Sequence, residues 1–322
     1  MGLTIIRDFR KEDFDDVIAC SKVSFSEEIE IHGFDPEVWR KIANRRFSVL
    51  GKTLFAFLKL LNKEPMKFFV AEVDGKVVGT TMVTKRGNTG YVSTMMVHSD
   101  FRRKGIATEL MKTTIEYVQK RKLARAILHV ISTNKPAKNL YQKLGFKKFD
   151  DFLYLTAETD SLQIPESAGG IHVRDFQKSD LDPVYELIKT VRDPDWLRIN
   201  DFKKNDLRTP WFSRITPMSH LKKIVAVKYE KIVGYASLSY TSAKEAGRIT
   251  SIDVSPEFVS EGVGENLVRM SANCVRPFEI KTVLATVPLN KEELVKRLRA
   301  LGFEKRLVME GMALELTGKD QP

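Results

Sequence analysis

The feature that most constrains the fold of this chain is a repeat within its own sequence. Three segments of the first half recur in the second half, in the same order and displaced by 167, 155 and 157 residues. The matched segments are residues 6–17 with 173–184, residues 70–79 with 225–234, and Gly145-Phe146 with Gly302-Phe303. Ordered matches at similar displacements predict that a whole domain has been duplicated.

The join between the two copies is also visible in the sequence. Residues 156–170 are polar, contain Pro165, Gly169 and Gly170, and show no hydrophobic period,. A length of 322 residues suits two domains,. We therefore predict a first domain over residues 1–156, a linker over 157–170 and a second domain over 171–322. The first copy is 12 residues longer between the first and second matches.

Hydrophobic patterns predict alternating strands and helices in the first copy. Residues 68–73 and 76–84 are rich in valine and flank Asp74-Gly75, which predicts a β-hairpin,. Residues 91–97 and 126–131 are apolar runs that indicate buried strands,. Residues 108–119 show a helical apolar face. A second helix is expected over 136–144, with Pro136 in its first turn,.

A short turn between the strand at 91–97 and the helix at 108–119 predicts an anion site. Its sequence is Arg102-Arg103-Lys104-Gly105-Ile106-Ala107. The first N–H groups of a helix lack partners and lie at the positive end of the helix dipole, so they attract anions. Gly105 and Ala107 leave room for a ligand to approach the backbone.

A second segment follows, with Asn134, Ala137, Leu140 and Tyr141 ahead of Gly145-Phe146. Together with the turn, it resembles the GNAT superfamily of acyl-CoA-dependent N-acetyltransferases. In that family the turn reads Arg or Gln, two residues, Gly, one residue, and Gly or Ala. The second motif reads Asn-x-x-Ala-x-x-Leu-Tyr-x-x-x-Gly-Phe. The resemblance covers residues 4–156 and implies an α/β (α+β) fold with two tandem GNAT-like domains, each a mixed, mostly antiparallel sheet flanked by helices.

The resemblance also implies how acetyl-CoA, the cosubstrate, is held. The turn would bind its pyrophosphate, the backbone of the preceding strand would pair with the pantetheine arm and polarise the thioester, and Asn134 would contact pantetheine. A cap on the following helix is the structural alternative for Asn134, and the two roles are compatible. The cofactor-binding residues expected on this basis are Met95, Met96, Val97, Arg102, Arg103, Lys104, Gly105, Ile106, Ala107, Thr108 and Asn134.

Two residues are expected to carry the proton transfers. Tyr141 matches the tyrosine that gives a proton to the departing CoA sulfur in the family, and a tyrosine pKa of about 10 suits that role. His129 stands where many members carry a glutamate base, five residues before Asn134. A neutral imidazole can accept the proton of an ammonium group near pH 7. The equally plausible alternative is a structural histidine, since an α-amine is already partly neutral at that pH.

The second copy departs from the family pattern. Val259 stands where the first copy has Arg102, Glu261 adds a negative charge to the turn, and Leu298 replaces Tyr141. Gly262 and Gly264 remain. We therefore expect a degenerate, non-catalytic second domain with weak or no CoA binding.

The net charge of +11 is unevenly distributed. Residues 85–148 hold 15 lysines and arginines against 3 acidic residues, so this segment carries the whole excess. A positive field there would steer the phosphates of CoA. A solvated face that contacts nucleic acid is the alternative. We prefer CoA because residues 102–104 belong to the motif, and we expect no nucleic-acid partner.

Composition sets the remaining expectations. Cys20 and Cys274 are far apart without metal-type spacing, which favours reduced thiols, a cytoplasmic protein and no metal,. The N-terminus resembles neither a signal peptide nor a myristoylation signal, and no apolar run reaches transmembrane length,. No membrane partner is therefore expected.

The function predicted from these features is transfer of an acetyl or other acyl group to a primary amine, by direct attack in a ternary complex, in the first domain. The acceptor is expected to be a small molecule or a peptide. Residues of the early helices and hairpin would form its site: Glu27, Glu28, Glu30, His32, Trp39, Arg45, Arg46 and Phe47. Two alternatives are an enzyme for a small amine or aminosugar built between both copies, and a CoA-responsive regulatory protein associated with nucleic acid or the ribosome.

Overall fold

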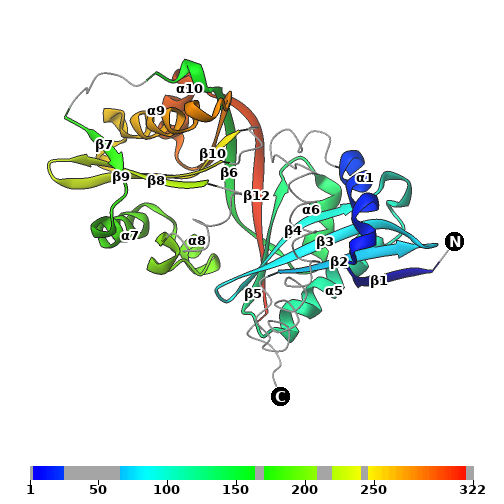
Figure 1. Ribbon diagram of the computed structural model, residues 1–322. Coiled ribbons are helices and arrows are strands. Elements are labelled where there is room, and N and C mark those ends of the chain that lie inside the picture. Colours follow the sequence, from blue (N-terminus) through cyan, green and yellow to red (C-terminus); the bar gives the residue numbers. More distant parts are fainter. Residues whose placement is uncertain (1–2, 25–65, 164–169, 209–219, 241–245, 317–322) are drawn as a thin grey trace. The chain divides into compact units, whose positions relative to one another are not determined.

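The computed structural model describes residues 3–24, 66–163, 170–208, 220–240 and 246–316, which form two structural units (Figure 1). Unit 1 comprises the described residues within Met1–Val130, Asn134–Phe149 and Gly311–Pro322. Unit 2 comprises those within Ile131–Thr133 and Asp150–Glu310. These limits differ from the predicted ranges 1–156 and 171–322, because the last strand of each repeat extends out of its own half.

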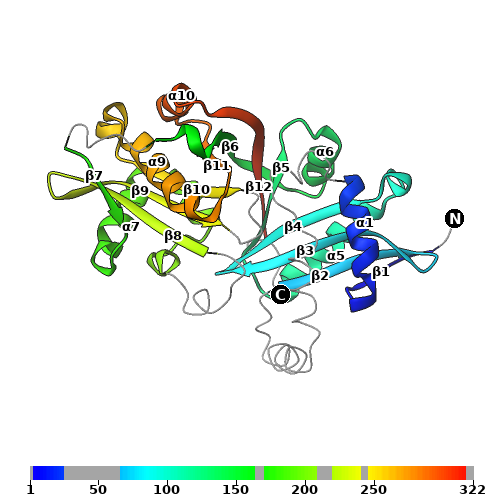
Figure 2. The ribbon, with the colours of Figure 1, turned by 45° about the horizontal axis from the view of Figure 1, so that its top comes forward.

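Unit 1 is a mixed sheet with helices on both faces. Its strands, in order across the sheet, are β1 (Thr4–Asp8), β2 (Met66–Val73), β3 (Lys76–Arg86), β4 (Thr89–Val97), β5 (Arg125–Ile131) and residues 311–315 of β12 (Glu304–Glu315). Its described helices are α1 (Phe14–Ser24), α5 (Ile106–Lys120) and α6 (Lys135–Lys143), with short 3-10 helices η1 (Lys11–Asp13) and η2 (Ser99–Phe101). Strands β1 to β4 are antiparallel, and β4 and β5 are parallel. α1 and α5 lie on opposite faces of this sheet (Figure 2).

Unit 2 repeats this plan. Its strands are residues 304–310 of β12, residues 150–158 of β6 (Lys147–Glu158), β11 (Thr282–Pro288), β10 (Gly247–Val254), β9 (Lys231–Tyr240), β8 (His220–Lys228) and β7 (His172–Asp175). Its described helices are α7 (Leu181–Val191), α8 (Pro194–Ile199), α9 (Val263–Val275) and α10 (Glu292–Ala300). The 3-10 helices are η3 (Thr159–Ser161), η4 (Lys178–Asp180), η5 (Lys204–Leu207), η7 (Pro256–Glu261) and η8 (Arg276–Phe278). α9 and α7 cover opposite faces (Figure 1).

The strands and helices predicted for the first copy are confirmed, with ends that move by one or two residues. The hairpin at Asp74-Gly75 has positive φ at both positions, 50° and 78°, as a two-residue turn between twisted strands requires,. Pro136 lies in the first turn of α6. The mixed, mostly antiparallel sheet of each unit confirms the predicted fold class.

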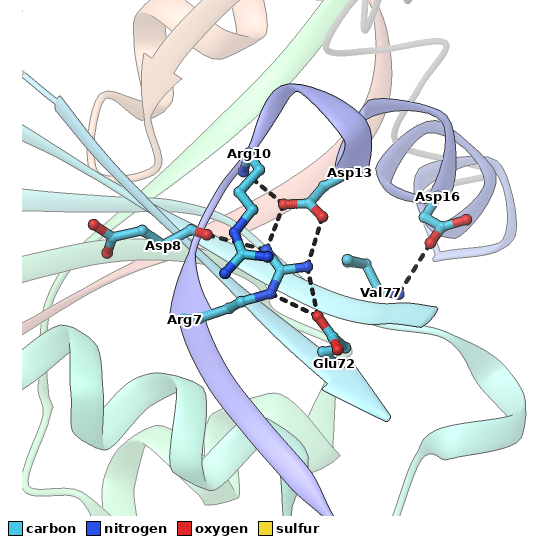
Figure 3. Close-up of polar contacts among 7 residues, drawn as sticks. All are labelled: Arg7, Asp8, Arg10, Asp13, Asp16, Glu72 and Val77. Carbon is cyan, nitrogen blue, oxygen red and sulfur yellow. Dashed lines mark hydrogen bonds and ion pairs between the residues drawn. The ribbon is translucent and has the colours of Figure 1, made fainter. Parts of the chain in front are cut away.

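The repeated sequence at the start of each copy has a structural explanation in unit 1 (Figure 3). Arg7 donates from both terminal nitrogens to the Asp13 carboxylate, at 2.7 Å each, and from Nε to Glu72 at 2.6 Å. Asp13 is 5% exposed and also accepts the backbone N–H of Arg10. Asp16 on α1 accepts the N–H of Val77 on β3. These contacts fix β1 and α1 against the sheet.

The contacts of Asp13 with Arg7 and with the Arg10 N–H recur in unit 2, whereas Val227 and Pro183 stand where unit 1 has Glu72 and Asp16. Arg174 donates to both oxygens of Asp180, at 2.6 and 2.9 Å, and Asp180 accepts the N–H of Gln177. Even the exposed pair between Asp8 and Lys67 has a counterpart between Asp175 and Lys222. The first repeated segment is therefore an anchor for the first strand and helix of each unit.

Each unit includes a segment from the other half of the sequence, and the pairing and packing of the last strand of each repeat explain why. β6 follows α6 in the first repeat, but it pairs antiparallel with β11, from Glu158 opposite Thr282 to Phe152 opposite Pro288. The end of β12 supplies Met312, which is 1% exposed within a core cluster of unit 1. Its neighbour Leu316 donates its N–H to the carbonyl of Ala124.

Candidate functional site

The turn between β4 and α5 has the geometry of an anion site. Gly105 is the N-cap of α5, with φ of +84°, a conformation that other residues adopt only with strain,. A Cβ placed on Gly105 would meet no atom within 4 Å, so the space above the turn is open. Among the described residues, no acceptor partners the backbone N–H groups of Gly105, Ile106 and Ala107. The N–H of Thr108 is already used, because it donates to the Gly105 carbonyl at 2.9 Å.

The first and third residues of the turn have contacts of their own. Arg102 donates from Nε to the carbonyl of Val97 at 3.1 Å, and Ser24 at the end of α1 donates to the same oxygen at 3.3 Å. Arg102 therefore braces the turn against the end of β4. The Lys104 ammonium lies 4.9 Å from the centre of the Phe101 ring.

Strands β4 and β5 open the sheet beside this turn. Their parallel pairing runs from Thr89 opposite Arg125 to Val92 opposite Leu128 and extends no further, and the strands diverge beyond it (Figure 2). A bulge interrupts β4 at this point, where Thr94 has φ of +48°. Positive φ is strained for a β-branched residue, and such strain is frequent at functional sites.

A cavity of about 680 Å³ extends from the turn along the end of β4 to α6. It is lined by Ser24, Met95, Met96, Val97, Phe101, Arg102, Arg103, Gly105, Ile106, Ala107, Thr108, Asn134, Pro136, Ala137, Asn139, Leu140, Tyr141 and Lys143. The structure thus brings together all of the residues predicted for the site except Lys104 and His129. Ser24, which the sequence motifs do not include, belongs to the wall because α1 ends beside β4.

The second motif forms the other wall of the cavity. Asn134 caps α6, since its side-chain oxygen accepts the N–H of Ala137 at 3.2 Å. The cap uses only the oxygen and leaves the amide NH₂ as a donor. Tyr141 is 6% exposed, and its ring lies 6.0 Å from that of Phe146. Gly145, with φ of +90°, ends the helix so that Phe146 can pack there,.

His129 does not line this cavity. Its Nδ1 lies 2.8 Å from the hydroxyl of Tyr91 on the neighbouring strand β4. Burial raises the pKa of Tyr91, and the guanidinium of Arg86, 4.7 Å from the ring, opposes that rise. The hydroxyl therefore stays neutral and can exchange a hydrogen bond with the imidazole. The sequence analysis did not identify Tyr91, although its place on the strand next to His129 was a usable signal.

The expected acceptor residues, from Glu27 to Phe47, lie outside the described residues. Within the part of the chain that the structure describes, no three His, Cys, Asp or Glu side chains are grouped so that they could hold a metal ion. No helix among the described residues is long and apolar enough to cross a membrane.

Comparison with known proteins links this geometry to a family. The model of the acetyltransferase (GNAT) family matches residues 35–146. N-alpha-acetyltransferase 30 of Dictyostelium discoideum is 31% identical over 117 residues, which are 35% of this chain and 63% of that protein. An acetyltransferase of Sodalis glossinidius is 35% identical over 95 residues, 30% of this chain and 67% of that protein. The chain spans less than two thirds of the Dictyostelium relative.

A solved structure has a similar fold. It is a tandem GNAT protein from the clavulanic acid biosynthesis pathway, with a TM-score of 0.65 at 17% identity, and the match covers 99% of this chain and 100% of that one. At this identity the likeness concerns the fold alone.

Proposed function

The chain belongs to the GNAT acetyltransferase family, and we propose that the cavity of unit 1 transfers an acetyl group from acetyl-CoA to a primary amine. The observation that carries this proposal is that three features meet in one cavity. They are the helix N-terminus with free N–H groups at Gly105, the opened backbone of β4 from Met95 to Val97, and the buried Tyr141.

The shape and chemistry of the cavity fit acetyl-CoA. Free N–H groups and the basic side chains of the turn suit a pyrophosphate. The diverging strands leave the backbone of β4 available to a pantetheine arm, and the NH₂ of Asn134 is a further donor on the opposite wall. Backbone donors aimed at a thioester oxygen would stabilise the charge that develops on it.

In the proposed reaction the neutral amine attacks the acetyl carbon directly, without an acetylated enzyme. A C–N bond forms, the C–S bond breaks, and the sulfur receives a proton from the Tyr141 hydroxyl. The proton lost by the attacking nitrogen leaves through a base. His129, hydrogen-bonded to Tyr91, is the proposed acceptor of that proton; because it does not line the cavity, the transfer runs through water,.

The acceptor we propose is an α-amine, such as the N-terminus of a peptide or protein. The name of the Dictyostelium relative, an N-alpha-acetyltransferase, favours this class. Such amines have a pKa of about 7.7–8.0, so a useful fraction is neutral at physiological pH and the demand on the base is small. Small amines and aminosugars are the competing acceptors, and a regulatory protein that binds CoA without turnover is the alternative from another class.

A thiol-release assay with acetyl-CoA and a panel of small amines, peptides and proteins tests the proposal. Tyr141→Phe should lower kcat by roughly 10²–10⁴-fold with little change in CoA affinity. Tyr185→Phe in unit 2 is the matched control. Turnover unchanged in the Tyr141 variant, with chemistry as the slow step, would remove this residue from the mechanism.

The cofactor site is tested separately by calorimetry. Gly105→Trp places a bulky side chain in the open space above the turn and should abolish CoA binding. Gly75→Trp is the matched control, because Gly75 also has positive φ, 78°, and open space, but lies in the hairpin away from the cavity. Equal CoA affinity for both folded variants would contradict the assignment.

A further inference from the structure

Unit 2 keeps the backbone of the anion turn. Gly262 is the N-cap of α9 with φ of +86°, two degrees from the value at Gly105. The parallel pairing of β10 with β11 runs only from Gly247 opposite Val283 to Ile249 opposite Ala285, so these strands also part beside the turn. A displacement of 157 residues relates the equivalent positions of the two turns.

An acidic side chain occupies this turn in unit 2. Glu265, in the first turn of α9, stands where unit 1 has Thr108. It is only 8% exposed. Its Oε1 accepts a hydrogen bond from Nη1 of Arg297 at 2.6 Å, and its buried Oε2 has no hydrogen-bond partner among the residues that the structure describes. A carboxylate in the first turn of a helix is stabilised by the positive end of the helix dipole, and Oε1 lies 3.9 Å from the place of a Cβ added to Gly262,.

Arg297 ties this carboxylate to the neighbouring helix. It lies on α10, at the position of the cavity-lining Leu140 of unit 1. Besides Glu265, it bonds the carbonyl of Ser260 in the turn and Oε1 of Glu293 on its own helix, the latter at 3.1 Å. Arg297 therefore links the turn to α10 in unit 2, at the place that corresponds to the cavity of unit 1.

Apolar packing closes the rest of the groove between α9 and α10. Leu294, 4% exposed, replaces the cavity-lining Ala137 of unit 1. A Cβ added to Gly264, the equivalent of Ala107, would lie 2.4 Å from Leu294 Cδ1, so the two helices are in direct contact. Leu298, in place of Tyr141, is fully buried in the core of unit 2.

In unit 2, the position equivalent to Asn134 holds a lysine whose side chain bonds to the backbone of unit 2. Lys291 stands there, and its Nζ donates to the carbonyl of Val191 at 2.7 Å. A residue that could donate to pantetheine in unit 1 is thus replaced by one whose ammonium is bound to a backbone carbonyl of unit 2.

We infer that unit 2 supplies its own anion, the Glu265 carboxylate held by Arg297, in place of the cofactor phosphates, so that the chain binds one CoA and not two. The closure of unit 2 goes beyond the proposed function and does not depend on it. Only the count of one rests on the proposed cofactor site in unit 1.

The count is measured by titrating the full chain with CoA in a calorimeter. One CoA per chain is expected for the wild type and for Gly262→Trp, and none for Gly105→Trp. Two per chain, or a loss of one on changing Gly262, would overturn the inference while leaving acetyl transfer by unit 1 intact. One CoA per chain without acetyl transfer to any amine would instead defeat the proposed function alone.

A gain of binding tests the role of Glu265 itself. In the Gly105→Trp background, Glu265→Thr restores the residue of unit 1, removes the anion from the helix N-terminus and leaves Arg297 with Glu293 as its carboxylate partner. Inorganic pyrophosphate should then bind at least tenfold more tightly than to the Gly105→Trp parent. Glu293→Thr is the matched control, since it removes another carboxylate from the same arginine outside the turn, and it should gain nothing. No gain from Glu265→Thr in a folded protein, or an equal gain from both changes, would overturn the inference.

Discussion

At the scale of single residues, the contact between Tyr91 and His129 links β4, whose end lines the cavity, to β5. Tyr91→Phe removes only the hydroxyl at 2.8 Å from the imidazole and keeps the ring in its edge-on contact, with centroids 5.4 Å apart. If His129 accepts the proton of the attacking amine, the variant should lower kcat about tenfold and displace the acidic limb of the pH–rate profile. A changed melting temperature with an unchanged profile would assign the pair a structural role only.

Asp150 and Asp180 show that burial and pairing act on carboxyl groups in opposite directions. Hydrogen bonds from Arg174 hold the pKa of Asp180 below its usual range. Its stabilising contribution is therefore present at neutral pH and lost as the pH falls through that lowered pKa. At Asp150, burial raises the pKa from 3.8 to about 6, against the opposing effects of the Asp151 N–H and Arg192. The folded state then favours the protonated form, and stability falls as the pH rises from about 4 to 6,.

Asp150→Asn should therefore stabilise the protein above pH 6. The gain in the free energy of unfolding expected at pH 7.5 is about 1 kcal/mol. It is smaller than the raised pKa alone would give, because the carboxyl group is partly exposed and screened by solvent. Urea unfolding at pH 4 and pH 7.5 measures it, and the gain should disappear at pH 4. Asp151→Asn is the neighbouring control, and an equal effect from both changes would contradict the assignment to Asp150.

At the scale of elements, the sequence predicted those features that depend only on a few neighbouring residues, such as turns and the first turns of helices. Asp74-Gly75 located the hairpin and Pro136 the first turn of α6, because each depends on backbone preferences of a few residues,. Most residues of the candidate site were expected instead from the resemblance of the turn and of the α6 motif to the GNAT pattern. The pairing of the last strand of each repeat with strands of the other repeat, here called the strand exchange, could not be predicted. β6 pairs with β11, more than 100 residues away, and nothing in its own sequence marks that partner.

The end of β12 gives a prediction about this exchange. Met312 belongs to the second repeat but is 1% exposed in the core cluster of unit 1 that also contains Tyr141. Met312→Ala should cost about 2–5 kcal/mol through the cavity it leaves. Thermal unfolding with saturating CoA measures it, and the CoA-protected transition should be the one that moves. Met309→Ala in unit 2 is the control, and a shift of only the unprotected transition would contradict the place of Met312 in the core of unit 1.

At the scale of the whole molecule, the uneven charge should control how the cofactor binds. The excess of basic residues over 85–148 coincides with the turn, α5 and α6, and Arg102, Arg103 and Lys104 are all exposed. Exposed charges act through solvent over a Debye length of about 10 Å at 0.1 M salt, so added salt weakens their attraction for the phosphates of CoA. Because several exposed charges are screened, the affinity for CoA should therefore fall severalfold, on the order of tenfold or less, between 50 and 500 mM salt.

S-acetylpantetheine, which lacks the phosphates, is the control ligand. It should bind more weakly, and its affinity should change little with salt. Titrations of both ligands across this range make the comparison, and a CoA affinity as insensitive to salt as that of S-acetylpantetheine would mean that the basic segment does not face the bound phosphates.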